Sequence, residues 1–418
     1  MTASDLRIVE RRLLRRLEEL GRIGRDPRGG VTRLSFTEDH AAACRCLAAW
    51  LRDAGLDPRL DDAGNLFGMP AAPVPEQRLI LVGSHIDSVP MGGTLDGALG
   101  VVAAIEAAQV LHDAGFRLAH PLAVAAFADE EGNSFGVGCL TSRAVVGQLG
   151  PEVQVGLRDR DGRSFAERVA AWSCDLPRGA PPAAAAYLEL HIEQGPRLEA
   201  AGLDAAAATS IAGISRTTAI FEGAANHAGT TPMESRRDAM WGASAFVLAL
   251  RRLGFDAEGG AVATAGRVDV EPGATNVIPG RARVRVELRA PDHDGLAAVR
   301  EAAEAAARDA ASCYGLDLRL DPWDTMPATP LDPGLVGIAV AAAARRGLRV
   351  QRMPSWAGHD AKILAPHVAS ALLFVPSRGG ISHAPDEYTE PRHLAAGAQL
   401  LLDTIQDADS HLSTRFAQ

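Results

Sequence analysis

Residues 78–100 read RLILVGSHIDSVPMGGTLDGALG, and the stretch begins with a nearly continuous apolar run. Such a run is typical of a strand that is buried on both faces of a sheet. A helix is expected next over 97–114, closed by Gly115, and further apolar runs follow at 122–128 and 187–192. This alternation of strands and helices predicts an α/β domain with a mainly parallel, helix-covered sheet.

The middle of the chain has a different pattern. Residues 282–288 alternate arginine or glutamate with valine, which indicates a strand with one solvated face. Other expected strands are 215–221, 262–270, 316–321 and, later, 369–375, and expected helices are 5–23, 38–54, 235–253, 294–312, 334–346 and 391–407. Residues 212–326 should therefore form an inserted α+β domain with a four-stranded antiparallel sheet and two helices. Residues 1–211 and 327–418 should form one discontinuous α/β domain.

Composition excludes several classes of protein. The 418 residues are 47% hydrophobic and 22% charged, so a largely disordered chain is excluded. With 42 basic and 52 acidic residues and no basic tract, no nucleic-acid partner is expected. Five cysteines without a CxxC pair argue against a disulfide framework and a thiolate zinc site. An arginine-rich start and no apolar run of about 18 residues predict a cytoplasmic protein without a membrane partner.

Four polar clusters follow apolar segments. They are GSHIDS at 83–88 with GGTLDG at 92–97, ADEEGN at 128–133, LHIEQGP at 190–196 and GGISHAP at 379–385. In open α/β sheets, ligands bind outside the carboxyl ends of the strands, where these clusters should lie. A single histidine or an acidic pair in a loop is ordinary surface structure, but four such clusters at one sheet edge indicate a site.

The side chains in these clusters favour metal chemistry. Three imidazoles and several carboxylates, without thiolates, suit zinc or a similar divalent metal. Two such ions about 3.5–4 Å apart activate water and polarise a carbonyl together. Glu130 and Glu131 are adjacent and cannot share one strand face, which suits two different roles.

The sequence resembles the amidohydrolase branch of the zinc aminoacylase and carboxypeptidase superfamily. This branch contains N-carbamoyl-L-amino acid hydrolases, β-ureidopropionases and allantoate amidohydrolases. The resemblance covers nearly the whole chain and rests on a series of motifs in order. They are GSHIDSVPMGGTLDGALG, ADEEGNSFG, LHIEQGP, NHAGTTPM, GATNVIPG, AGHDA and GGISHAPDEYT.

The resemblance implies a dinuclear metal centre. By position in the motifs, His85 and His191 would bind one ion, Glu131 and His383 the other, and Asp96 would bridge both. Zinc is the first expectation for the two ions of each subunit, with manganese, cobalt and nickel as alternatives. Five protein ligands are therefore expected in one centre.

Further roles follow from the same resemblance. Asp87 would orient His85, and Glu130 would be the general base that takes the water proton and delivers it to the leaving nitrogen. Three residues would line the substrate pocket: Gln194 at the ureido group, and Gly358 with His359.

The inserted domain resembles the family's lid and dimerisation domain, so a homodimer is expected. His227 would reach a neighbouring subunit's site and stabilise the developing oxyanion. Asn276 and Arg289 would hold a substrate carboxylate, although Arg289 also fits an ordinary exposed strand face. Trp356 stands where the family commonly has a small residue, which predicts a reshaped pocket.

The expected activity is hydrolysis of the carbamoyl C–N bond of an N-carbamoyl-L-amino acid. Its products would be the L-amino acid, carbon dioxide and ammonia. Allantoate or another ureide is the nearest alternative substrate. An aminoacylase or dipeptidase activity, or a ligand-binding relative without catalysis, is a further alternative. A ligand-binding relative without catalysis would be expected to lack the general base, whereas Glu130 is present.

Overall fold

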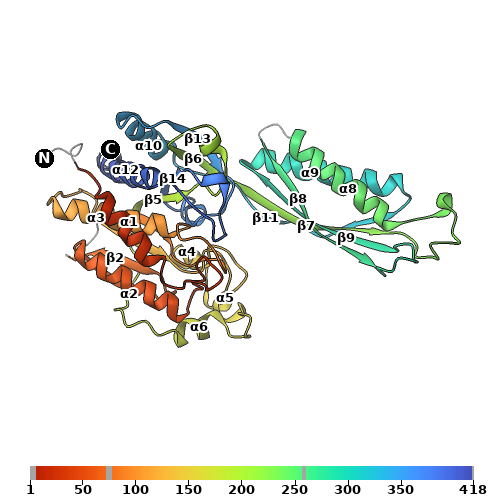
Figure 1. Ribbon diagram of the computed structural model, residues 1–418, viewed down its shortest axis with the longest axis horizontal. Helices are drawn as coiled ribbons and strands as arrows, with labels where there is room; N and C mark the ends of the chain where they lie inside the picture. Colours follow the sequence, from red (N-terminus) through yellow and green to blue (C-terminus); the bar gives the residue numbers. More distant parts are fainter. Residues whose placement is uncertain (1–5, 72–77, 257–259, 417–418) are drawn as a thin grey trace. The chain divides into compact units, whose positions relative to one another are not determined.

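The computed structural model describes residues 6–71, 78–256 and 260–416, and the chain divides into two compact units. The first unit consists of Met1–Thr209, Leu331–Met353 and Ala357–Gln418, and the second of Ser210–Pro330 and Pro354–Trp356. Both units appear in Figure 1. Residue 5, where the first helix was expected to begin, lies outside the described residues.

The larger sheet has nine strands in the order β1-β2-β4-β3-β5-β14-β6-β12, with β13 beside β6 (Figure 1). The central strands are β4 (Leu122–Phe127), β3 (Leu79–His85), β5 (Ala184–Ile192) and β14 (Ala369–Val375), and each runs parallel to its central neighbours. The others are β1 (Leu56–Leu60), β2 (Leu66–Pro70), β6 (Ala205–Ile211), β12 (Thr329–Pro330) and β13 (Val350–Ser355). Strands β1, β2, β6 and β12 pair antiparallel with their neighbours in this order. The parallel arrangement predicted from the sequence is confirmed at the centre of the sheet.

Apolar sequence explains why these central strands are buried. Every residue of β3 and β4 is buried, as is every residue of α3 from Ala98 to Leu111. Helices α3 and α12 pack against central strands and against each other. The helices of the first unit are α1 (Glu10–Leu20), α2 (Glu38–Asp53), α3 (Ala98–Asp113), α4 (Leu140–Val145), α5 (Pro151–Gly156), α6 (Phe165–Ala171), α7 (Arg197–Ala200), α10 (Pro333–Arg345), α11 (Asp360–Leu364) and α12 (Pro391–Phe416). Because the four central strands are parallel, their carboxyl ends lie at one edge of the sheet.

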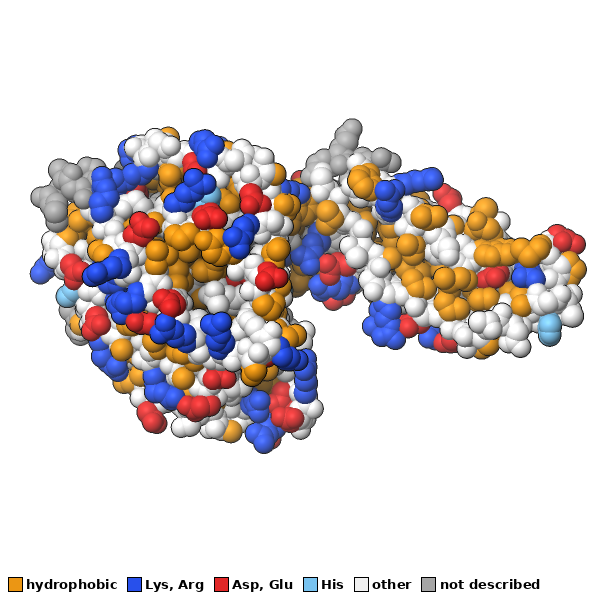
Figure 2. Space-filling model, in the orientation of Figure 1, with side chains coloured by type: hydrophobic (Ala, Val, Ile, Leu, Met, Phe, Trp, Pro, Cys, Tyr) orange, Lys and Arg blue, Asp and Glu red, His pale blue; other side chains and the backbone are white. Residues whose placement is uncertain are grey.

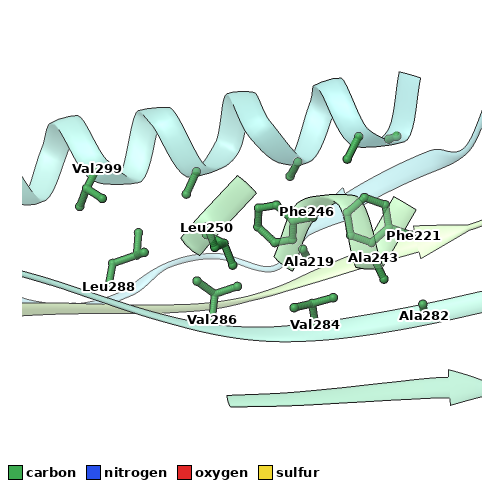
Figure 3. Packing of buried hydrophobic residues seen from close by; sticks show 14 of the residues in the cluster. Ala219, Phe221, Ala243, Phe246, Leu250, Ala282, Val284, Val286, Leu288 and Val299 are labelled. Carbon is green, nitrogen blue, oxygen red and sulfur yellow. The ribbon is translucent and has the colours of Figure 1, made fainter. Parts of the chain in front are cut away.

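The second unit is a twisted antiparallel sheet with two helices. Its elements are β7 (Gly213–Glu222), α8 (Ala239–Asp256), β8 (Val262–Glu271), β9 (Arg281–Ala290), α9 (His293–Cys313), β10 (Asp317–Leu320) and β11 (Asp324–Met326). Alternate residues of β9 from Ala282 to Ala290 are buried, and the intervening arginines and glutamate are more exposed. Figure 3 shows Val284, Val286 and Leu288 pointing toward Phe246 and Leu250 of α8. The predicted half-solvated sheet is confirmed.

The sheet of the second unit has five strands, so the predicted number of four was wrong. Strand β11 pairs with β7, whose other neighbours are β9 and β10. It is only three residues long, Asp-Thr-Met, and therefore too short to produce a readable alternation. In the described part of the chain, no helix combines the length and apolar character needed to cross a bilayer.

Burial also determines the ionisation of His40 on α2. Its imidazole is fully buried, stacks on Trp172 with 4.8 Å between ring centroids, and accepts the Phe36 N–H through Nδ1 at 3.1 Å. This burial lowers the pKa of His40 to about 4, with Asp87 opposing the shift and Arg33 adding to it. The folded protein therefore holds a neutral imidazole here.

The free energy of unfolding should fall as the pH drops from about 6.5, the usual pKa of histidine, to about 4. In this window the unfolded chain binds a proton that folded His40 does not, at a cost of up to about 3 kcal/mol. Above it both states are neutral, and the contribution is fully present. Urea unfolding of chelated protein at several pH values should show a shallower pH dependence in His40→Gln. Parallel curves for the two proteins would contradict the assignment.

Candidate metal centre

The five expected metal ligands lie together at the carboxyl edge of the central strands. Asp96 is at the middle of the cluster. Its Oδ1 is 3.4 Å from His85 Nε2 and 3.2 Å from His191 Nε2, and its Oδ2 is 3.3 Å from His383 Nε2. Glu131 Oε1 is 3.2 Å from the same His383 nitrogen. One carboxylate thus faces all three imidazoles.

These atoms form two overlapping groups of donors. His85, Asp96 and His191 make one, and Asp96, Glu131 and His383 make the other, each with its donor atoms within 4.8 Å of one another. The two groups share Asp96, as expected for a bridging ligand. A third group, His85 with Glu130 and Glu131, brings Glu130 within reach of the same centre.

The hydrogen bonds of the imidazoles fit bound cations. His85 Nδ1 lies 3.1 Å from the Asp87 carbonyl oxygen, and His191 Nδ1 lies 2.9 Å from the Ile192 carbonyl oxygen. A carbonyl oxygen can only accept a hydrogen bond, so each Nδ1 is protonated; when the ring is neutral, as in a metal ligand, its lone pair is on Nε2 beside Asp96, and that of His191 also lies 3.1 Å from the Gly97 backbone N–H. Lone pairs directed at a carboxylate are the arrangement that a cation between them stabilises.

Burial and charge act in opposite directions on Asp96. Burial alone would raise the pKa of this carboxyl, yet His191, His383 and His85 hold it well below its usual range. Its Oδ1 atom is buried, and no described residue donates a hydrogen bond to it. An ionised, buried oxygen without a donor is costly unless a cation neutralises it. The residues present therefore fit a pair of divalent ions.

A second layer of side chains holds Asp96 in place. Glu387 Oε1 accepts the backbone N–H of Leu95 and of Asp96, at 2.9 and 3.1 Å. The Ser382 hydroxyl lies 2.8 Å from Asp96 Oδ2 and 2.9 Å from Glu387 Oε2. Gln194 Nε2 donates to Asp96 Oδ2 at 2.7 Å, so this expected substrate contact is beside the metal ligands. Such outer contacts orient metal-binding carboxylates.

Asp87 contacts both His85 and the acidic pair. Its carboxylate accepts the backbone N–H of Glu130 at 3.1 Å and of Glu131 at 3.2 Å. The nearest carboxylate oxygen is 3.6 Å from His85 Nδ1, whereas the Asp87 carbonyl oxygen is 3.1 Å away. The carbonyl is thus the closer partner of His85, and the carboxylate positions the acidic pair.

Glu130 is buried beside the cluster. Burial raises the pKa of its carboxyl well above the usual value, and the positive influence of His85 opposes this. Oε2 is 3.9 Å from His85 Nε2, whereas Oε1 accepts a hydrogen bond from the Cys139 thiol at 3.1 Å. Cys139 also donates its backbone N–H to the Glu130 carbonyl oxygen at 2.7 Å. The two carboxylate oxygens therefore face different surroundings.

The backbone near the centre is strained in several places. Asp129, Cys139, Gln194 and His383 all have positive φ values, between 53° and 57°. Residues other than glycine adopt this region at a cost, and such strain gathers at functional sites. Gly97 also has a positive φ, and a Cβ there would lie 2.5 Å from the His85 ring. Glycine at position 97 thus lets α3 begin directly against His85, an expected metal ligand.

Two further pocket residues lie beside these groups. The His359 ring packs edge-on against the His191 ring, with 4.6 Å between centroids. A Cβ added to Gly358 would lie 3.9 Å from Glu130 Oε1. Both residues thus border the centre within the first unit.

The remaining expected residues belong to the second unit. His227 and Asn276 are neighbours there, since the Ala228 N–H donates to the Asn276 carbonyl oxygen at 3.0 Å. Arg289 lies near the opposite end of β9 and donates to Glu287 Oε1 at 2.8 Å and to the Trp356 carbonyl oxygen at 2.6 Å. The structure therefore separates Arg289 from the His227–Asn276 pair.

Residues 81–407 match the Peptidase family M20/M25/M40. The chain belongs to this family. It is 39% identical over 403 residues to the N-carbamoyl-L-amino acid amidohydrolase of Geobacillus stearothermophilus, which covers 94% of this chain and 97% of that protein. It is 33% identical over 394 residues to the allantoate amidohydrolase of Bacillus subtilis (strain 168), covering 93% and 95%.

A solved structure is also similar over nearly its full length. The hydantoinase/carbamoylase family amidase from Burkholderia multivorans gives a TM-score of 0.89 at 35% identity and covers 96% of this chain and 98% of that one. Membership of the M20/M25/M40 family, together with these amidohydrolase relatives, makes the chain a metal-dependent hydrolase of C–N bonds. The family and the His/Asp/Glu cluster agree on divalent metal use.

Proposed function

We propose that this protein hydrolyses the carbamoyl C–N bond of N-carbamoyl-L-amino acids and releases the L-amino acid, carbon dioxide and ammonia. The observation that carries the proposal is the shared carboxylate of Asp96 between two donor groups, with Glu130 buried beside it. The carbamoyl-amino-acid hydrolase among the relatives supports this substrate class.

In the proposed chemistry, the bound ions and the protein side chains have different roles. His85 and His191 would hold one ion, Glu131 and His383 the other, with Asp96 shared. When bound, such ions polarise a carbonyl and lower the pKa of water. Zinc is the metal we propose, because imidazole and carboxylate donors without thiolates suit it, as they also suit manganese, cobalt and nickel.

Glu130 would act as the general base. Its Oε2 faces the cluster while Oε1 is held by Cys139, so one oxygen is left to take the proton of the attacking water. The same oxygen would then deliver that proton to the leaving nitrogen. Asp87 keeps the acidic pair in register through two backbone N–H groups.

Allantoate is the second candidate substrate, because it carries the same carboxylate and ureido groups and an allantoate amidohydrolase is among the relatives.

Ammonia release should be measured on N-carbamoyl-L-amino acids, their D-enantiomers, allantoate, N-acetyl amino acids and dipeptides, with free amino acid measured for the last two. We expect metal-dependent turnover of the L-carbamoyl compounds. Turnover of allantoate alone would identify allantoate as the substrate. No turnover of any ureide would refute the proposed substrate class.

The positions of the carboxylate-binding residues favour a homodimer. Strand β9 has ten residues and spans about 30 Å at about 3.3 Å per residue. Arg289 is near one end of this strand, and Asn276 with His227 lies beyond the other. One small substrate cannot touch both ends, so we propose that His227 and Asn276 act in the site of a partner subunit.

The surface of the second unit offers a place for that partner. Five large apolar side chains on α8 and β8 are at least 38% exposed: Met240, Leu248, Phe255, Val262 and Val268. Figure 2 shows hydrophobic side chains on the face that carries α8. Strand β8 is also at the edge of its sheet. An apolar patch beside an open strand edge is typical of an interface. Analytical ultracentrifugation gives the oligomeric state. A fully active protein that is a monomer by this measurement would contradict the proposed dimer.

Trp356→Gly should change the preference among substrates rather than the metal chemistry. Removing the indole enlarges the space at this position, so we expect the ratio of kcat/KM for bulky over small side chains to rise by about tenfold. Trp356→Phe keeps a large ring and should resemble the natural protein. An unchanged preference in Trp356→Gly would show that Trp356 lies away from the substrate.

Cys139→Ala should lower kcat by about three- to tenfold and leave KM unchanged, because one hydrogen bond that orients Glu130 is lost. Cys139→Ser keeps a donor of similar size and should recover most of the rate. Equal kcat in the alanine variant and the natural protein would show that Cys139 only fills buried space.

A further inference from the structure

A pair of cysteines lies away from the metal centre, where the segment after α6 runs along α2. Trp172 donates its indole N–H to the Thr37 carbonyl oxygen at 3.0 Å and stacks on His40. Two residues later, the Cys174 sulfur lies 4.0 Å from the Ala41 carbonyl oxygen. Positions three or four apart share one face of a helix, so the segment follows a single face of α2.

Cys44 is the next residue on that face. It is fully buried, whereas Cys174 is partly exposed, and both are free thiols. Each thiol shifts the pKa of the other, which places the two side chains beside one another. The pair therefore joins an accessible thiol to a buried one that lies directly behind it.

The surroundings activate the accessible member. The Cys44 thiol lowers the pKa of the Cys174 thiol against the effect of burial, and the positive charges of Arg45 and Arg178 add to the lowering. Cys174, together with burial, raises the pKa of the Cys44 thiol well above its usual value. Thiolate character at a partly exposed cysteine beside a second thiol is the pattern of reversibly oxidised pairs.

We propose that Cys174 and Cys44 form a reversible peroxide-oxidised site, with Cys174 as the attacking thiol and Cys44 as the resolving one. The Cys174 thiol gives up its proton and its thiolate attacks one oxygen of hydrogen peroxide; the O–O bond breaks, Cys174 becomes a sulfenic acid, and the departing hydroxide takes up that proton as the first water. The Cys44 thiol then attacks the Cys174 sulfur and forms the S–S bond, and its proton joins the departing sulfenic hydroxyl as the second water. Two thiols are oxidised and one peroxide is reduced to two waters. The bond would fasten the segment at 172–176 to α2.

This proposal does not depend on the hydrolase substrate and is tested without an activity assay. The metal-loaded protein is treated with a small molar excess of hydrogen peroxide, alkylated, digested without reductant and analysed by mass spectrometry. We expect a peptide pair linked through Cys44 and Cys174, with a loss of two hydrogen atoms that dithiothreitol reverses. Cys313→Ser, which removes an exposed cysteine elsewhere, should give the same pair.

Cys174→Ser should abolish the linked pair, and because position 174 is partly exposed we expect this variant to fold. Cys44→Ser should instead leave Cys174 as sulfenic acid, which a dimedone probe captures, or as its more oxidised forms. The proposal would be overturned if Cys174 and Cys44 were both alkylated after treatment. It would also be overturned if Cys174 in the natural protein were overoxidised while Cys44 stayed a free thiol.

Discussion

Glu130→Gln should reduce kcat by about 10²- to 10⁴-fold, the range that a positioned general base contributes. The amide has nearly the same shape and can still accept the hydrogen bond from Cys139, so the fold and the pocket should be preserved. It cannot accept a proton from water at neutral pH. KM should therefore change little, and bound metal, measured by inductively coupled plasma mass spectrometry, should stay at two ions per chain.

The matched variant is Glu131→Gln, one residue further along the same loop. Its carboxylate faces His383 at 3.2 Å, as expected of a ligand, so this variant should lose metal as well as activity. Comparing the two variants distinguishes a general base from a metal ligand. The comparison is needed because Glu130 is also within reach of the donor cluster. Loss of metal from Glu130→Gln, with activity restored by excess metal, would make Glu130 a ligand and leave the base unassigned.

Asp96→Asn should have the largest effect on metal content. An amide in this position would offer one neutral oxygen to the three imidazoles instead of two charged ones, and its NH₂ group would face the donors of Gln194 and Ser382. We expect both ions to be bound far more weakly and turnover to fall by more than about 10³-fold, measured on protein passed through a desalting column.

Glu387→Gln provides a graded control, since Glu387 touches Asp96 and Ser382 but none of the imidazoles is among its hydrogen-bond partners in the described residues. Loss of such an outer contact should weaken metal affinity by about 10- to 100-fold, and excess metal should restore the rate. Asp96→Asn should not be restored in this way. Retention of two ions and normal turnover by Asp96→Asn would refute the bridging role.

The central fold was predictable because its strands are uniformly apolar. Strand β3 can be recognised without knowing which strands pair with it, because its whole length is buried on both faces. Strand β9 of the second unit was equally readable, because its residues alternate between buried and more exposed along its length. Apolar content of this kind is visible in the sequence without knowledge of the pairing.

Other elements carried too weak a signal. Strand β1 contains Pro58 and two charged residues, which disfavour strand predictions, yet it pairs with β2 at the edge of the sheet. Strand β6 begins with four alanines, a helix-favouring residue, and is held in the sheet by β14 and β12. In both cases tertiary pairing outweighs local propensity.

For the metal centre, the order of the motifs predicted the ligand residues. The structure added the contacts between loops, which the motifs do not show. The sequence grouped His85, Asp96 and His191, and the structure brings their donor atoms together. The roles of Cys139 and Glu387 were missed, because their contacts cross between loops that are distant in sequence. Glu387 follows His383 by four residues, so its place in that motif was the only available signal.

The most direct test of the account is a metal titration of the chelated protein with N-carbamoyl-L-amino acid hydrolysis as the readout. Zinc or manganese is added in steps, and bound metal and ammonia release are measured on the same samples. We expect no turnover without metal and a maximum when two ions are bound per chain. Full turnover in the chelated protein, or a maximum at a single bound ion, would contradict the two-ion centre built around Asp96.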